Sequence, residues 1–171
     1  MTTAGKAGMN GVRLREAQPD DWLAVESLLA DAELPLAGAR EHLGDFIVAE
    51  GAAATLLGCA ALERYAAGCA AGDAAGAEES DARVSGLLRS LAVAPAARGL
   101  GLGASLVESL LSAARAQGLA DVTLLTTTAA EYFPRFGFQQ IAREAAPLAV
   151  RDSIEFREAC PASAVVMSRA L

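Results

Sequence analysis

A strand, loop, helix and strand unit between Leu87 and Thr127 constrains the fold of this chain more than any other segment. The apolar run LLRSLAV, Leu87 to Val93, is typical of a buried strand, and the helix expected from Gly103 to Gln117 carries its large apolar residues on one stripe. A second apolar run, VTLLTT from Val122 to Thr127, follows this helix. Because two strands joined through a helix run parallel with a right-handed crossover, the unit predicts an α/β domain.

The segment RGLGLGAS, Arg98 to Ser105, joins the first strand of this unit to the helix. Its glycines stand at every second position, so the backbone can turn tightly and point successive amide groups at one anion. The start of the helix adds partial positive charge. A flexible linker is excluded because strongly patterned segments flank the loop on both sides. We interpret the loop as a cradle for a pyrophosphate.

Two other phosphate-binding loops compete with this interpretation. A Walker loop ends in a lysine, and the only lysine of the chain is Lys6, so that loop is excluded. The dinucleotide fingerprint fits better, because Gly99, Gly101 and Ala104 satisfy GxGxxG/A and Asp121 follows about twenty residues later. However, Asp121 precedes its strand instead of ending one, and the loop comes late in the chain. The dinucleotide interpretation is therefore disfavoured.

The segments on either side of this unit predict further strands and helices. Alternation in VRLREA, residues 12–17, indicates a half-buried strand, and Pro19 begins a helix whose apolar residues recur at helical spacing. Gly118 should end the helix of the central unit. We also expect helices at 39–43 and 129–135, helical structure at 148–158, a hairpin of strands 46–50 and 55–65 joined by the turn GAAA, and strands 138–141 and 164–169.

Residues 66–86 contain alanine, glycine and acidic residues and almost no large side chain. Such a segment cannot bury enough surface to offset its ordering entropy, so we expect a mobile loop between two strands. An alanine-rich helical turn within it is the alternative. The length of 171 residues suits one domain, 1–171, with a single core.

The composition of the chain limits the classes of partner that it can bind. A formal charge of −7 disfavours a broad cationic surface for nucleic acid or anionic lipid, so a small-molecule partner is favoured. The N-terminus lacks an apolar signal segment, and the longest charge-free run, Gly51 to Leu62, is far shorter than the ~20 residues of a membrane helix. We therefore expect a cytoplasmic protein.

Neither the cysteines nor the histidine predict a metal site. Cys59, Cys69 and Cys160 are odd in number and show no CxxC spacing, and His42 is the only histidine. We expect Cys59 to be a small buried hydrophobe and His42 to lie on a surface helix.

The pattern Arg-x-x-Gly-x-Gly that begins at Arg98 resembles the pyrophosphate loop of the GNAT N-acetyltransferases, which holds coenzyme A. The stretches LLRSLAVAPAARGLGLGASLVESLL and VTLLTTTAAEYFPRFGF resemble the strand and helix pairs of that family's core. Within the family, LERY, LLRSLAV, LLTTTAA and CPASAVVM are most similar to the arsenic-resistance N-acetyltransferases, which are bacterial detoxification enzymes. Glutamate-acetylating enzymes share a similar strand.

The resemblance implies a fold and a cosubstrate. The fold is an α/β (α+β) mixed sheet of about six or seven strands with flanking helices, in which a splayed parallel pair forms the acyl-CoA site. Acetyl-CoA would be the cosubstrate, and the unpaired amides near Leu91 to Val93 would bind its pantetheine arm and polarise the thioester. The expected cofactor-binding residues are Leu91, Ala92, Val93, Arg98, Gly99, Leu100, Gly101, Leu102, Gly103, Ala104, Thr126 and Phe133.

Arg89 stands in the middle of an apolar strand, on the face of Leu87 and Leu91 if the side chains alternate. A guanidinium is costly there unless an anion meets it. One interpretation is that Arg89, with Ser90 and Arg64, binds an oxyanion of the acetyl acceptor. The other is a structural salt bridge to Glu63 or another acid.

Two further residues are candidates for proton transfer. Glu63 lies on the strand expected beside Leu87 to Val93 and could accept the proton of the acceptor ammonium, although an exposed Glu63 is equally consistent with the sequence. In the family, a tyrosine at the start of Y-x-x-x-Gly-Phe commonly protonates the leaving thiolate. Here that position holds Phe133, with Tyr132 one residue earlier. Either Tyr132 has been recruited, or water protonates the thiolate and Tyr132 only packs.

The sequence thus predicts an N-acetyltransferase for the primary amine of a small, amino-acid-like anionic acceptor, such as glutamate or its arsenic or phosphorus analogues. Acetylation of a protein N-terminus or lysine is an alternative. A CoA-binding regulatory module without catalysis is a second, and an arsenite sensor that uses the three cysteines is a third. A homodimer is compatible with each of them.

Overall fold

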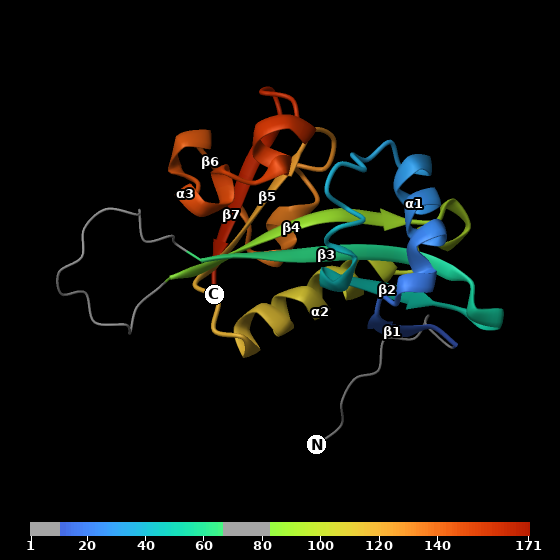
Figure 1. Cartoon of the computed structure of the whole chain (residues 1–171). Helices are drawn as coiled ribbons and strands as arrows, with labels where there is room; N and C mark the ends of the chain where they lie inside the picture. Colours follow the sequence, from blue (N-terminus) through green and yellow to red (C-terminus); the bar gives the residue numbers. More distant parts are fainter. Residues whose placement is uncertain (1–10, 67–82) are drawn as a thin grey trace, which may run out of the picture. The chain divides into compact units, whose positions relative to one another are not determined.

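The computed structural model describes residues 11–66 and 83–171 (Figure 1). Seven strands form one mixed sheet in the order β1-β2-β3-β4-β5-β7-β6. The strands are β1 (Arg13–Glu16), β2 (Phe46–Glu50), β3 (Leu56–Ala66), β4 (Val84–Val93), β5 (Asp121–Thr126), β6 (Gln139–Ile141) and β7 (Val165–Ala170). The helices are α1 (Trp22–Asp31), α2 (Leu102–Ala116) and α3 (Leu148–Arg151), with short 3₁₀ turns and one π-helix, η7 (Glu155–Ala159).

The described residues group into two compact units. Among the described residues, unit 1 comprises 11–61 and 90–110, and unit 2 comprises 62–66, 83–89 and 111–171. The chain passes from one unit to the other within β3, β4 and α2.

In unit 1, β2 pairs antiparallel with β3, as the hairpin interpretation predicted, and it also pairs antiparallel with β1. The apolar stripe of α1 predicted from the sequence buries Val25, Leu28 and Leu29 against Phe46 and Val48 of β2. Figure 1 shows α1 on one side of these strands and α2 on the other. Burying such a stripe, at roughly 2 kcal/mol per large side chain, holds α1 on the sheet.

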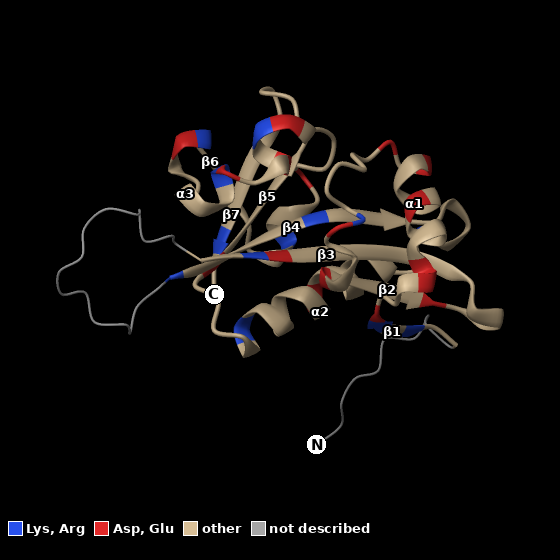
Figure 2. Ribbon diagram, viewed as in Figure 1, with Lys and Arg blue, Asp and Glu red and all other residues tan. Residues whose placement is uncertain are grey.

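Charged residues on β1 tie it to its neighbours. Arg15 donates to Asp21 at 2.6 Å and to Glu50 at 2.5 Å. Figure 2 shows basic residues on β1 and acidic residues along α1. Pairing with Arg15 lowers the pKa of the Asp21 carboxyl, which also accepts a hydrogen bond from the amide of Gln18.

In unit 2, β4 and β5 pair in parallel, as the strand, loop, helix and strand unit predicted. Their ladder comprises three residue pairs, from Ser85↔Asp121 to Leu87↔Thr123. On its other side β5 pairs antiparallel with β7, which also pairs with β6. A core of Leu87, Val150, Phe156 and Val166 fixes the C-terminal helical segments on this sheet.

Most predicted bounds lie within one residue of those in the structure, and three predicted segments differ more clearly. Residues 39–43 form turns followed by a 3₁₀ turn at Leu43–Asp45, because a five-residue helix next to Gly38 at φ +73° cannot repay its nucleation cost. Residues 129–135 do not form an α-helix, since Pro134 cannot donate a helical hydrogen bond, and a 3₁₀ turn occupies Phe133–Phe136. The expected 66–86 loop is shorter, because β3 includes Ala66 and β4 begins at Val84; residues 67–82 lie outside the described part.

The helical potential at 148–158 divides between α3 and the π-helix η7. Gly118 ends α2 with φ +72°, as predicted. Within the described residues, no helix has the length and apolar character needed to span a bilayer.

Candidate active site

The glycine loop of unit 1 adopts the geometry that its sequence predicts. Gly99 and Gly101 have φ of +79° and +81°, a region that other residues adopt only at a cost. A Cβ at either position would meet no atom within 4 Å, so backbone conformation, and not crowding, requires glycine there. Leu100 between them is half exposed. The loop therefore offers an open backbone surface.

Helix α2 follows the loop without an intervening residue. The amide of Ser105 bonds to the carbonyl of Gly101 at 3.1 Å, which makes Gly101 the residue that caps the helix. The first amides of a helix, here those of Leu102, Gly103 and Ala104, have no acceptor within the helix. Together with the helix dipole they form a site suited to an anion.

Arg98 connects this loop to the end of β4. Its Nε donates to the carbonyl oxygen of Val93 at 3.2 Å while the side chain stays exposed. Just before this, Ser90 has φ +58°, which interrupts the alternation of side chains along the strand. The regular alternation on which the prediction for Arg89 and Leu91 rested is therefore broken at Ser90. The carbonyl of Ser90 accepts a hydrogen bond from the thiol of Cys59.

Unit 2 holds a buried charge cluster. Arg89 on β4 places Nη1 3.0 Å from Oε1 of Glu63 on β3 and Nη2 2.9 Å from Oε2 of Glu155 on η7. Side-chain exposure is 2% for Arg89 and Glu63 and 7% for Glu155. The hydroxyl of Tyr65 donates to Oε2 of Glu63 at 2.5 Å. Of the two interpretations of Arg89, the structure thus shows the salt bridge, and Glu63 is buried and not exposed.

The cluster contains two carboxylates and one guanidinium, with neutral donors at its edges. Burial, reinforced by Glu63, raises the pKa of Tyr65, so the phenol remains a donor at neutral pH. Burial and the neighbouring Glu155 raise the pKa of Cys160 to about 12, and its thiol donates to Glu155 at 3.2 Å. No sequence signal singled out Glu155, because the acids between 148 and 158 are indistinguishable by spacing.

Arg64 does not belong to this cluster. It lies between Glu63 and Tyr65 on β3 and is exposed, whereas Glu63 pairs with Arg89 and Tyr65 donates to Glu63. Side chains alternate along a strand, so Arg64 projects from the other face of the sheet. The structure therefore places Arg64 and Glu63 on opposite faces of β3, although the sequence analysis assigned both to the acetyl acceptor.

The other predicted residues of unit 2 lie after β5. The hydroxyl of Thr126 accepts a hydrogen bond from the amide of Ala129 at 2.9 Å and closes the turn. Tyr132 packs edge-on against Phe133 at 5.4 Å between ring centroids, and the guanidinium of Arg135 lies 4.5 Å from the Tyr132 ring. Phe133 is buried and packs against Phe138. These contacts are those of packing side chains.

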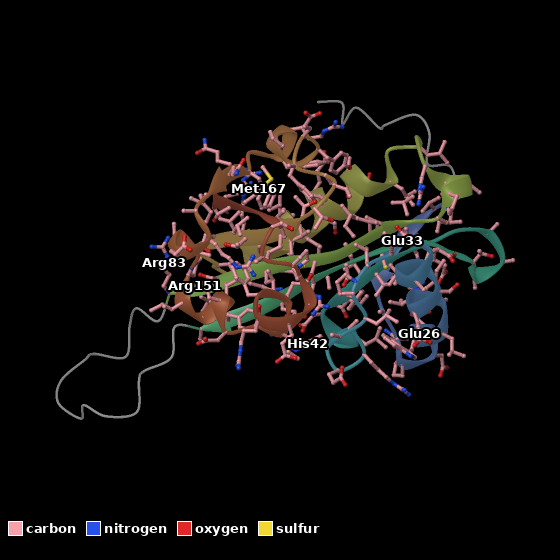
Figure 3. The ribbon with its side chains drawn as sticks, turned by 90° about the horizontal axis from the view of Figure 1, so that it is seen from above. Glu26, Glu33, His42, Arg83, Arg151 and Met167 are labelled. Atoms are coloured by element: carbon pink, nitrogen blue, oxygen red, sulfur yellow. The ribbon has the colours of Figure 1, made fainter. Side chains whose placement is uncertain are left out.

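Cysteine and histidine residues have no shared role in the described part of the chain. Cys59 is fully buried, as predicted, and burial raises its pKa to about 12. Cys69 lies outside the described residues. His42 occupies a turn at the surface, where it contacts Asp45 at 3.0 Å, and not a helix (Figure 3). Among residues 11–66 and 83–171, no group of three metal-binding side chains occurs.

The dinucleotide alternative does not fit this architecture. β5, which Asp121 begins, pairs with the antiparallel β7. The carboxylate of Asp121 lies 3.3 Å from Nη2 of Arg83, just before the start of β4. A parallel pair within a mixed sheet, with a glycine loop between the first strand and its helix, defines instead the acetyltransferase class of α/β folds. The model of the acetyltransferase (GNAT) domain matches residues 42–140, and the chain belongs to the GNAT acetyltransferase family.

Solved structures share this fold. The N-acetylglutamate synthase of Neisseria gonorrhoeae, complexed with coenzyme A and N-acetyl-glutamate, is 24% identical with a TM-score of 0.71, over 94% of this chain and 35% of that one. Rv2747 of Mycobacterium tuberculosis, in complex with CoA and NLQ, is 25% identical with a TM-score of 0.68, over 93% and 99% of the two chains. A GNAT acetyltransferase of Staphylococcus aureus is 14% identical with a TM-score of 0.70, over 94% and 99%.

This chain spans about a third of the length of the N. gonorrhoeae synthase. The comparison with curated proteins finds no match. Neither the family model nor these three structures point specifically to arsenic resistance.

Proposed function

We propose that this protein transfers an acetyl group from acetyl-CoA to the primary amine of a small, amino-acid-like anionic acceptor. The observation that carries the proposal is the loop from Arg98 to Ala104, in which Gly99 and Gly101 have positive φ directly before α2. The residues present suit a diphosphate, since Arg98 supplies a cation and the loop supplies open backbone amides.

The proposed cofactor contacts divide into three sets. The amides of Gly99 to Ala104 would bind the diphosphate, with Arg98 beside them. The backbone of Leu91, Ala92 and Val93 would bind the pantetheine arm and donate to the thioester carbonyl as negative charge develops there. The short ladder between β4 and β5 supports this role, because strands that part after three residue pairs leave later backbone groups available. Thr126 and Phe133 would contact the same arm.

In the proposed reaction, the free amine of the acceptor attacks the thioester carbon and coenzyme A leaves as the thiolate. Glu63 takes the proton that the acceptor ammonium must lose. Support for this assignment comes from its buried carboxylate, which Tyr65 and Arg89 hold in one position. The thiolate is protonated by Tyr132 or by water. Because Phe can replace the packing of the Tyr132 ring, an unchanged kcat in Tyr132→Phe would assign this step to water.

The acceptor class rests on the resemblance to arsenic-resistance enzymes and on the glutamate derivative in the N. gonorrhoeae structure. Glutamate and its phosphorus or arsenic analogues are the candidates. We propose Arg89 and Ser90 as contacts of the acceptor. The surroundings of Arg89 limit how it can bind an anion. Two carboxylates already face Arg89, so an acceptor oxyanion would have to share the guanidinium with them or displace one.

A thiol-release assay tests the function. Purified protein is incubated with acetyl-CoA and, in separate reactions, with glutamate, its phosphorus and arsenic analogues, other amino acids and peptides. Release of coenzyme A that depends on a small anionic amino acid supports the proposal. Release with peptides alone would favour a protein N-acetyltransferase, and acetyl-CoA binding without turnover would favour a regulatory module.

A further inference from the structure

Glu155 is a buried ionisable residue that the proposed chemistry does not use. It begins the π-helix η7, a type of helix that is uncommon and frequently marks functional positions. Its Oε2 lies 2.9 Å from Nη2 of Arg89, while Nη1 of the same guanidinium lies 3.0 Å from Oε1 of Glu63. Arg89 thus has two carboxylate partners, one on each terminal nitrogen.

Glu63 would be a poor proton acceptor if it were the only counter-ion of Arg89. If Glu63 alone paired with Arg89, protonation of Glu63 would leave a buried guanidinium without an anion, which is strongly unfavourable. Such a cost would oppose the uptake of a proton. With Glu155 present, Arg89 keeps one carboxylate when Glu63 becomes neutral.

We propose that Glu155 is a positioning residue for acetyl transfer, the counter-ion that holds Arg89 while Glu63 takes the proton of the acceptor ammonium. This inference rests on the proposed function, in which Glu63 is the base. One N–H bond of the ammonium breaks, one O–H bond forms on the Glu63 carboxylate, and the nitrogen lone pair becomes free to attack the thioester carbon. The charge of the three side chains changes from −1 to 0, and the Arg89 to Glu155 pair persists.

The groups around the three side chains are compatible with this role. From β3, Tyr65 donates to Glu63, and its raised pKa keeps it protonated. From the end of η7, the Cys160 thiol donates to Glu155. Arg143 is a second nearby cation, and it donates to the carbonyl of Phe156 on η7 at 2.6 Å. Arg89 is therefore the cation that bridges the two carboxylates.

The test compares Glu155→Gln with Glu158→Gln, which removes the same charge from an exposed position of the same helix. Steady-state kinetics with acetyl-CoA and the acceptor found in the thiol-release assay are measured between about pH 5.5 and 9. We expect Glu155→Gln to lower kcat roughly tenfold or more, and to move the acidic fall in activity by ~0.5 pH unit or more toward lower pH. The KM for acetyl-CoA stays within about twofold, and Glu158→Gln behaves as the wild type.

Glu155→Asp is the second variant and keeps the negative charge. It tests the inference if Glu155→Gln does not fold. We expect it to keep kcat within about threefold and the wild-type pH profile. Wild-type kcat and profile in Glu155→Gln would overturn the inference, and so would a loss in a folded Glu155→Asp of tenfold or more. A Glu63→Gln variant with an unaltered pH profile of kcat would show that Glu63 is not the base, and the inference would fall with it. Absence of acetyl transfer by the wild type would instead overturn the proposed function.

Discussion

Arg98 donates from Nε to the carbonyl oxygen of Val93 over 3.2 Å, which ties the first residue of the glycine loop to the last residue of β4. In unit 1 the proposed thioester donors and the proposed diphosphate cradle are thereby held by one side chain. The hydrogen bond leaves the rest of the guanidinium available to a phosphate. A substitution that moves the glycine loop should therefore also move the end of β4.

The conformation of Gly101 gives the first prediction. Gly101→Ala places a Cβ on a residue with φ +81°, so we expect a loss of about 1 kcal/mol in unfolding free energy and a roughly tenfold weaker Kd for acetyl-CoA. Gly44→Ala is the matched control, because its Cβ meets open space and its φ is not left-handed. Denaturant unfolding and calorimetric titration measure the two effects. Equal affinity in both variants would contradict the assigned role of the loop.

Ser90 gives a prediction of the opposite sign. Its φ of +58° is unfavourable for a side chain, so Ser90→Gly should raise the unfolding free energy by about 1 kcal/mol. Ser85→Gly, at a buried and regularly paired position of the same strand, should lower it by roughly 0.5–1 kcal/mol. Urea unfolding of the two variants checks the pair. A loss in both would show that the Ser90 backbone is not strained.

Removal of the shared cation should be costly. Arg89→Met leaves Glu63 and Glu155 buried without a counter-ion, and we expect it to lower the unfolding free energy by ~3 kcal/mol near neutral pH. The loss should be smaller at about pH 5, where a carboxylate can take up a proton. Arg64→Met, at the exposed neighbouring position, should change stability by less than about 0.5 kcal/mol. Equal losses in the two variants would contradict the picture of a buried ion cluster.

Cys59 should weaken the fold in alkali. Burial raises its pKa from 9.0 to about 12, so above pH 9 the unfolded state releases a proton that the folded state keeps. Stability is then complete below pH 9 and falls as the pH rises toward 12, at up to ~1.4 kcal/mol per unit. Cys59→Ala should show a shallower fall between about pH 9 and 11 in urea unfolding. An identical slope in both proteins would exclude this thiol as the cause.

Local rules of the sequence account for much of this fold. Gly118 predicted the end of α2, and the run from Phe46 to Glu50 predicted β2 with its bounds. Pro134 lies within a segment for which a helix was expected. Because proline lacks the backbone N–H that an α-helix needs, a 3₁₀ turn forms there instead. The bounds of β3 and β4 extended into a segment of small residues, because pairing and packing at Gly86 outweigh weak local preference.

The candidate site was predictable where it depends on backbone. The glycine loop follows from positive φ, which few residues other than glycine adopt readily. The buried cluster was only partly predictable, because a mid-strand Arg89 demands an anion but does not name it. Glu63 was one named partner, whereas Glu155 comes from a helical segment 66 residues further along the chain, and no spacing rule connects it with Arg89.

The proposed function depends above all on the backbone from Arg98 to Ala104 binding the diphosphate of coenzyme A. Calorimetric titration of the full chain with coenzyme A and with pantetheine, which lacks the nucleotide and its diphosphate, tests it most directly. We expect coenzyme A to bind at least ~10-fold more tightly than pantetheine, and Gly101→Ala to remove most of this difference. Equal affinity for the two compounds, or an unchanged difference in Gly101→Ala, would contradict it.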